Sequence, residues 1–349
     1  MTPILVLDHF YLSISLLVTI GYQLLGFAIA WTFQFDKITD FTGGSNVFIL
    51  SLLTWLLGGN FSARNILANV FVMVWAVRLA TFLLYRVLKY GSDSRFDDIR
   101  SHFFKFFGFW VGQIIWVWTI SLPLTILNSP ALSEHSSYAV WGKATDILGV
   151  IFFWIGWSFE TSADLRKFMY KASNPPKDKP IDVGLWKWSR HPSYFGEMLC
   201  WWGIWLICVT PSLHGSLSPS TKAAQYGAVV SPLFTMSLLL FASGLPTAEK
   251  PQARKFYLLS HPLPGSEEDH SSATRRTVES NIEDDSSTTP VARLAETSAW
   301  ENYQAYRAQT SILLPLPPAL YRHLPRFVKQ TILCDWPMYE FKPERDLQG

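Results

Sequence analysis

The chain has 349 residues, of which 49% are hydrophobic and only 16% are charged, whereas soluble domains average about 25% charged residues. Its 16 tryptophans suit a protein whose rings line membrane interfaces, and its net charge of +2 gives no electrostatic footprint for nucleic acid. The three cysteines, Cys200, Cys208 and Cys334, form no CxxC pair, which argues against a disulfide framework or a zinc site. This composition predicts a multi-pass integral membrane protein.

Several apolar segments are candidates for membrane spans. A spanning helix needs about 20 mostly apolar residues. The candidates are 12–33, 47–59, 66–88, 107–127, 147–162, 195–210 and 226–245. The second is too short unless its helix begins near Phe41 or is re-entrant. No cleavage site follows the first, so we expect a retained span rather than a signal peptide. The expected fold is an all-α transmembrane bundle of about seven spans.

The basic residues of the loops alternate along the chain. Loops 89–106, 128–146, 163–194 and 211–225 contain four, one, seven and one Lys or Arg, respectively. Because Lys and Arg favour the cytoplasmic side, we expect the first and third loops and the C-terminal tail to lie in the cytosol.

Residues 264–299 differ in composition from the rest of the chain, because they are rich in Ser and Thr and hold eight acids against three Arg. Such a segment buries too little apolar surface to offset its ordering entropy, which predicts a disordered cytosolic insert. A tail tuned by phosphorylation is the alternative. We therefore expect a bundle over 1–263, this insert, and a cytosolic or interfacial segment over 300–349 that completes a site.

Charged residues follow the fifth predicted span. Glu160, Asp164, Lys167 and Lys171 recur every three or four residues and share one helical face. Charges near membrane depth usually face a bundle interior or a polar cavity. The alternative is a helix that emerges into water with ordinary ion pairs.

A second polar element opens the sixth span. Pro192 suits the first turn of a helix, which places Arg190 and His191 at its positive N-terminal end, a ready anion site. Glu197 lies inside the apolar run that follows. Contact with lipid headgroups would also explain Arg190 and His191, and a structural pair with Lys167 would explain Glu197. The spacing of six between His191 and Glu197 does not favour a metal pair.

A third polar element follows the acidic insert. Tyr303, Tyr306 and Arg307 share one helical face, where tyrosine rings can enclose a flat ring and an arginine can neutralise a phosphate. An amphipathic interfacial helix is the alternative. No GxGxxG, Walker A, HExxH or GxSxG motif occurs in the sequence.

Together these elements resemble the DUF1295 family, in the group that shares the steroid 5-alpha-reductase C-terminal domain. The resemblance extends from about Arg78 to Pro315. It rests on Gly91-Ser-Asp93-Ser-Arg95-Phe, on Glu160-x-x-x-Asp164, on Trp186-Lys-Trp188-Ser-Arg190-His191-Pro192-Ser-Tyr194-Phe-Gly196-Glu197, on Ser243-Gly-x-Pro246-x-x-Glu249-Lys250, and on Tyr303-x-x-Tyr306-Arg307-x-x-Thr310-Ser311.

This resemblance implies one of two activities. The group contains NADPH-dependent reductases of lipid carbon–carbon double bonds, and S-adenosylmethionine-dependent prenylcysteine and phospholipid methyltransferases. Glu197 is similar to the acid of the reductases, whereas Ser193 departs from their asparagine. The resemblance also implies an endoplasmic reticulum location.

Carried over from the family, the predicted cofactor-binding residues divide by the part of NADPH that each would contact. Asp164 would bind the ribose or adenine side, Lys167 and Lys171 would meet phosphates, Arg190 and His191 would hold the pyrophosphate, Glu197 would position the nicotinamide amide with Tyr194, and Tyr303 and Arg307 would close the site.

Hydride delivery to an enone builds charge on the oxygen and requires a proton donor. Tyr85, Arg86 and Gln113, in or beside predicted spans, are alternatives to Tyr194 as that donor, and the catalytic prediction is Tyr194. The leading hypothesis is thus an NADPH-dependent reductase of a steroid-like or other lipid enone. The alternatives are an S-adenosylmethionine-dependent lipid or prenylcysteine methyltransferase and a non-catalytic lipid or sterol binder. The expected partners are lipids, and neither a metal nor a nucleic acid is expected.

Overall fold

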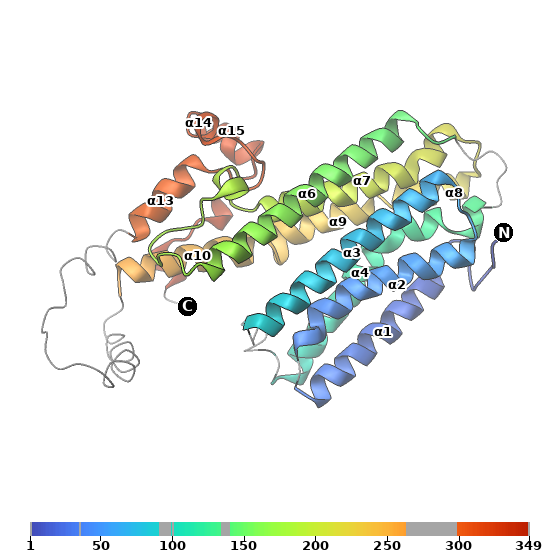
Figure 1. Cartoon of the computed structure of the whole chain (residues 1–349), viewed down its shortest axis with the longest axis horizontal. Helices are drawn as coiled ribbons and strands as arrows, with labels where there is room; N and C mark the ends of the chain where they lie inside the picture. Colours follow the sequence, from blue (N-terminus) through green and yellow to red (C-terminus); the bar gives the residue numbers. More distant parts are fainter. Residues whose placement is uncertain are drawn as a thin grey trace, which may run out of the picture. The chain divides into compact units, whose positions relative to one another are not determined.

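The computed structural model describes residues 2–34, 36–90, 99, 101–133, 140–262 and 299–347. These residues contain helices and isolated bridges but no β-strand, which confirms the all-α prediction (Figure 1). The chain divides into two compact units, Met1–Ser158 with Gly196–Ser237, and Phe159–Phe195 with Leu238–Gly349. Helices α6 (Ala144–Ala172) and α7 (Pro192–His214) contribute residues to both units.

The first unit is built from long apolar helices. In chain order these are α1 (Leu12–Thr32), α2 (Thr39–Gly58), α3 (Ala63–Tyr90), α4 (Phe103–Leu127), the first half of α6, most of α7, and the shorter helices α5 (Pro130–Ser133), α8 (Pro219–Gly227) and α9 (Val230–Ser237). Because α2 begins at Thr39, the second predicted span reaches full length, as expected for a helix that starts near Phe41.

Within the described residues, five helical segments are long and apolar enough to cross a membrane, which fits a multi-pass membrane protein. They are Leu12–Thr32, Thr39–Gly58, Ala63–Lys89, Phe103–Ser133 and Pro219–Ser260. The count of about seven spans is not confirmed. Helices α6 and α7 cover the other two predicted spans but are not among the five, and acidic residues such as Glu160 and Glu197 interrupt their apolar sequence.

The core of the first unit combines stacked rings with buried polar groups. Phe71 stacks on Phe153 at 4.2 Å between ring centroids, and the Trp75 and Trp201 rings meet edge to face at 4.8 Å. Arg64 and Asp146 form a bidentate ion pair with both contacts at 2.8 Å and almost no exposure. A buried ion pair of this geometry ties α3 to the start of α6.

Two pairs of glycines let α6 and α7 approach closely in the first unit. A Cβ on Gly156 would lie 2.5 Å from the Gly196 carbonyl oxygen, and one on Gly203 would lie 2.6 Å from that of Gly149. In each helix the two glycines are seven residues apart, so the four glycines form a stripe along the facing sides of α6 and α7. Small residues at such contacts are typical of packing between membrane helices.

The second unit contains the end of α6, the start of α7 and short helical elements. The others are η3 (Gly184–Lys187), η4 (Leu238–Ala242), α10 (Leu245–Ser260), α13 (Ala299–Gln309), α14 (Pro318–Tyr321), α15 (Arg326–Thr331), η5 (Pro337–Tyr339) and α16 (Pro343–Asp346). Helix α10 packs on α13, where Phe256 stacks on Tyr303 at 5.0 Å. The predicted insert over 264–299 lies outside the described residues, apart from Ala299 at the start of α13.

The C-terminal segment pairs with the chain that precedes α7. The Arg190 amide donates to the Ser311 carbonyl at 2.8 Å, and the Leu316 amide donates to the Trp188 carbonyl at 3.0 Å. Ser189 Oγ adds a bond to the Leu313 carbonyl at 2.8 Å. These bonds hold residues far apart in sequence around Arg190 and His191. The predicted division at 263/264 and 299/300 stays a prediction.

Candidate functional site

Arg190 and His191 lie immediately before Pro192, the first residue of α7, as the sequence predicts. Both side chains are buried, with 4% and 5% of the residue exposed. Buried charges require partners, because an uncompensated charge costs several kcal/mol, of order 3–5 when a pair is broken. The arrangement around Arg190 and His191 is therefore defined by the acids that meet them.

Glu249 of α10 contacts both side chains. Its Oε1 lies 2.7 Å from His191 Nε2, and its Oε2 lies 3.3 Å from Arg190 Nη1. Glu249 is itself 2% exposed. One carboxylate thus fixes the orientation of the imidazole and of the guanidinium together.

Asp335, which lies between α15 and η5, contacts the other side of the same guanidinium. Its Oδ1 lies 2.9 Å from Arg190 Nη2, and its Oδ2 accepts a hydrogen bond from the Tyr321 hydroxyl at 2.6 Å. Arg190 is therefore held between two carboxylates from different parts of the C-terminal half.

Burial and these partners shift the pKa values of Arg190, His191 and Tyr321, which lie outside the membrane-spanning segments. Burial lowers the pKa of His191 below its usual value, although the hydrogen bond to Glu249 opposes this, so the imidazole is favoured in its neutral form. Burial alone would lower the pKa of Arg190, but the Glu249 and Asp335 carboxylates raise it, so Arg190 is always charged. Burial raises the pKa of Tyr321, and Asp335 adds to the effect.

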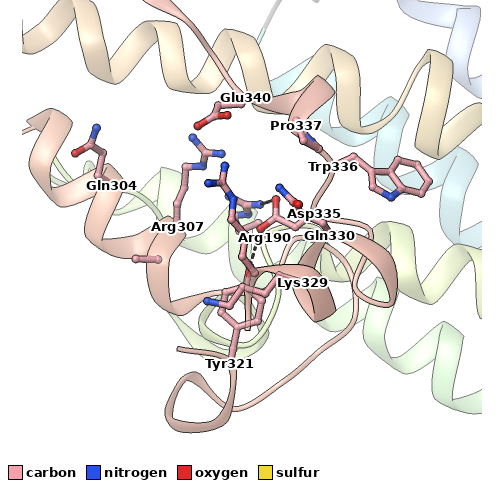
Figure 2. A pocket seen from close by; sticks show the side chains of 12 residues that line it. Arg190, Gln304, Arg307, Tyr321, Lys329, Gln330, Asp335, Trp336, Pro337 and Glu340 are labelled. Atoms are coloured by element: carbon pink, nitrogen blue, oxygen red, sulfur yellow. Dashed lines mark hydrogen bonds and ion pairs between the residues drawn. The ribbon is translucent and has the colours of Figure 1, made fainter. Parts of the chain in front are cut away.

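A pocket of about 330 Å³ opens beside this cluster (Figure 2). Four of the residues around it are cations and two are acids; the lining comprises Arg190, Gln304, Arg307, Ala308, Tyr321, Arg326, Lys329, Gln330, Asp335, Trp336, Pro337 and Glu340. Four positive charges less two negative charges leave a formal charge of +2. Figure 2 shows the guanidinium groups of Arg190 and Arg307 pointing into the same space.

Two arginine side chains at this pocket retain hydrogen-bonding capacity. In the part of the chain that the structure describes, the buried Nε atoms of Arg190 and Arg307 have no hydrogen-bond partner. A buried N–H donor without a partner is costly, so it marks a place where a ligand acceptor is favoured. The donors, the positive charge and the shape together suit an anion with several oxygens.

The structure places the predicted cofactor-binding residues in different surroundings. Arg190 and Arg307 line the pocket, and His191 is linked to Arg190 through Glu249. Tyr303 lies one helical turn from Arg307 on α13 and packs on Phe256.

The remaining predicted residues do not line this pocket. Lys167 lies over the Trp186 ring at 4.8 Å, while Asp164 and Lys171 are on the same helix, α6. Glu197 is half-buried on α7 and belongs to the first unit. Their roles stay predictions.

The predicted catalytic residue, Tyr194, lies directly beside the cluster. Its ring stacks on the His191 imidazole at 5.0 Å between centroids, with 6° between the planes. It is half-buried in the first turn of α7. Its role as a proton donor stays a prediction.

Sequence reasoning missed most of the residues that shape the pocket. Glu249 appears in a family motif, but its role as a bridge between Arg190 and His191 does not follow from the motif. Asp335 could have been noticed in the sequence, because it is the first acidic residue after a stretch from 312 to 334 that contains none. Four further lining residues, Tyr321, Arg326, Lys329 and Glu340, had no distinguishing pattern.

Known proteins are similar to this chain over the part that contains Arg190, His191 and Glu249. A family model described as "Protein of unknown function (DUF1295)" matches residues 26–259. An uncharacterized protein of Schizosaccharomyces pombe is 24% identical over 233 residues, which cover 57% of this chain and 64% of that relative. The match therefore spans less than two thirds of the relative. No solved structure matches.

Proposed function

The chain belongs to the DUF1295 family, and from that membership and the pocket beside Arg190 we propose that it is a membrane-embedded, NADPH-dependent reductase of a carbon–carbon double bond in a steroid-like or other lipid enone. The observation that carries the proposal is the pair of arginines, Arg190 and Arg307, directed into a pocket with a formal charge of +2.

The residues present fit the phosphate-bearing part of NADPH. Arg190 Nε and Arg307 Nε are buried donors without partners in the described structure, and Arg326 and Lys329 add charge around them. A volume of about 330 Å³ suits a pyrophosphate with an adjoining sugar rather than a whole dinucleotide. This pocket would therefore hold the phosphates.

In this proposal Glu249 has a supporting role. It keeps Arg190 charged and oriented and also fixes the His191 ring, so the guanidinium is preorganised before a phosphate arrives. Preorganised charge binds an anion more tightly, because no side chain has to be ordered on binding.

NADPH, when bound, supplies hydride to the double bond of the lipid. The chain would supply the proton that completes the reduction, and Tyr194 is the residue we propose for it. Its ring is held against the His191 imidazole, which itself is fixed by Glu249, so the phenol has a defined orientation.

We further propose that the protein resides in the endoplasmic reticulum with its C-terminus in the cytosol. Insertion of a glycosylation acceptor at the C-terminus would test this orientation.

The first test is cofactor binding by the full-length protein purified in detergent. NADPH and S-adenosylmethionine are titrated separately against wild type, Arg307→Gln and the control Arg345→Gln. Arg345 is exposed on α16, pairs with Asp346 and lies outside the pocket, so its loss removes one positive charge without changing the pocket lining. Loss of a charged hydrogen bond at Arg307 should weaken NADPH binding about tenfold or more.

The outcomes separate the candidate functions. Saturable NADPH binding that weakens in Arg307→Gln but not in Arg345→Gln supports the reductase and justifies a screen of lipid enones. Binding of S-adenosylmethionine alone would assign the chain to the methyltransferases. Binding of neither would refute the proposal and favour a lipid or sterol binder.

A further inference from the structure

The two carboxylates that hold Arg190 differ in their surroundings. The Glu249 side chain is 3% exposed, also binds His191 and does not line the pocket. The Asp335 side chain is 20% exposed and lines the pocket together with Arg190. Glu249 is therefore a fixed structural partner, whereas Asp335 lies on the side from which a ligand would approach.

Local structure directs Asp335 toward this position. Cys334 has a φ of 58°, in the left-handed region, and reverses the chain after α15. The Asp335 amide then donates to the Lys329 carbonyl at 3.0 Å. The Tyr321 hydroxyl holds the carboxylate at 2.6 Å, so one Asp335 oxygen faces Tyr321 and the other faces Arg190 Nη2.

A phosphate that enters the pocket would meet Asp335 in two ways. It would seek the Arg190 Nη2 donor that Asp335 Oδ1 already binds at 2.9 Å, and it would be repelled by the Asp335 charge. The formal charge of the lining is +2 with Asp335 and would be +3 without it.

We propose that Asp335 is a specificity-determining residue that competes with the anionic ligand for Arg190. A singly charged anion that displaces Asp335 from Arg190 replaces one negative charge with another, so it gains little binding free energy. An anion with two or more charges, such as a pyrophosphate, keeps a net attraction after Asp335 has been released. The competition therefore selects multiply charged phosphate ligands over monoanions. This inference rests on the proposed function, since it assumes that the pocket binds phosphates.

The test measures binding of inorganic pyrophosphate and of acetate by calorimetry, with wild type, Asp335→Asn and Glu344→Gln. Glu344 is exposed on α16 outside the pocket, so its variant makes the same change in net charge without removing the competitor. We expect Asp335→Asn to bind pyrophosphate about tenfold more tightly or better, and to bind acetate measurably, while Glu344→Gln matches wild type.

A second measurement needs no substitution at Asp335. Cys334 is half-buried next to it, whereas Cys200 and Cys208 are buried. If pyrophosphate releases Asp335 from Arg190, maleimide should label Cys334 faster in the presence of saturating pyrophosphate than in its absence. A Cys334→Ser variant identifies the labelled thiol.

The possible failures are distinguishable. If wild type and Asp335→Asn both fail to bind pyrophosphate, the pocket is not a phosphate site and the proposed function fails with it. If wild type binds pyrophosphate but Asp335→Asn binds it equally or more weakly, and the labelling of Cys334 does not change, the competition is refuted while the proposed function stands.

Discussion

Replacement of Glu249 by glutamine tests the charge arrangement on which the candidate site depends. The substitution keeps the shape of the side chain and still allows a hydrogen bond with His191 at the 2.7 Å contact, but it removes the negative charge that lies 3.3 Å from Arg190 Nη1. Arg190, whose side chain is 3% exposed, would then depend on Asp335 alone for neutralisation.

The size of the effect follows from the burial of Arg190. Removal of one partner from a buried ion pair costs about 3–5 kcal/mol, because the other charge is left uncompensated. Since Asp335 remains at 2.9 Å, we expect the lower end of that range, about 3 kcal/mol. For a unit of roughly 150 residues this lowers the unfolding midpoint by about 6–12 °C.

Thermal unfolding of the detergent-purified protein, followed by circular dichroism, measures this shift, with Glu344→Gln as the control for removal of an exposed acid. The double variant Arg190→Met/Glu249→Gln should lose less stability than the sum of the single variants, because the two residues share one interaction. A midpoint of Glu249→Gln within about 2 °C of wild type would contradict the reasoning, since it would mean that Arg190 does not need Glu249.

Three further predictions concern other parts of the chain. Gly156→Val should destabilise the first unit by at least about 2 kcal/mol in thermal unfolding, because its Cβ would overlap the α7 backbone. Gly112→Val, whose Cβ would have no atom within 4 Å apart from its own helix, should change the midpoint little. Asp146→Asn should cost about 3–5 kcal/mol, because Arg64 loses its buried partner; an unchanged midpoint would show that the pair contributes nothing. Because burial holds the pKa of His191 below its unfolded value of 6.5, the unfolded chain takes up a proton first as the pH falls, so stability should decrease as the pH drops below about 6.5, and His191→Gln should reduce this dependence in unfolding measured from pH 7 to 5.

The sequence predicts those features that depend on neighbouring residues. Long, nearly continuous apolar stretches predict α1, α3 and α4, and Pro192 marks the start of α7 with Arg190 and His191 before it. These patterns are local, so a single sequence is enough to read them.

The partners of Arg190 and His191 follow from tertiary structure instead. His191 meets Glu249 across 58 residues, and Arg190 meets Asp335 across 145 residues. No periodicity in the sequence connects positions so far apart. The sequence predicts Arg190 as a residue that contacts an anion, and only the folded structure shows that its side chain is buried and paired with two carboxylates. The glycine stripe of α6 and α7 has a spacing of seven that is visible in the sequence, but its meaning depends on which helices are neighbours.

The long separation between Arg190 and Asp335 has a consequence for biosynthesis. The ribosome synthesises the chain from its N-terminus to its C-terminus, so helices α1 to α4 and the Arg190–His191 pair are made well before Asp335. A messenger truncated before codon 311 would still encode most of the apolar helices, but its product would lack Ser311, Tyr321 and Asp335, and with them the partners that the C-terminal segment gives to Arg190. Such a product would enter the membrane with the proposed phosphate pocket incomplete, so residues 311–349 would decide whether a translated chain can bind a phosphate.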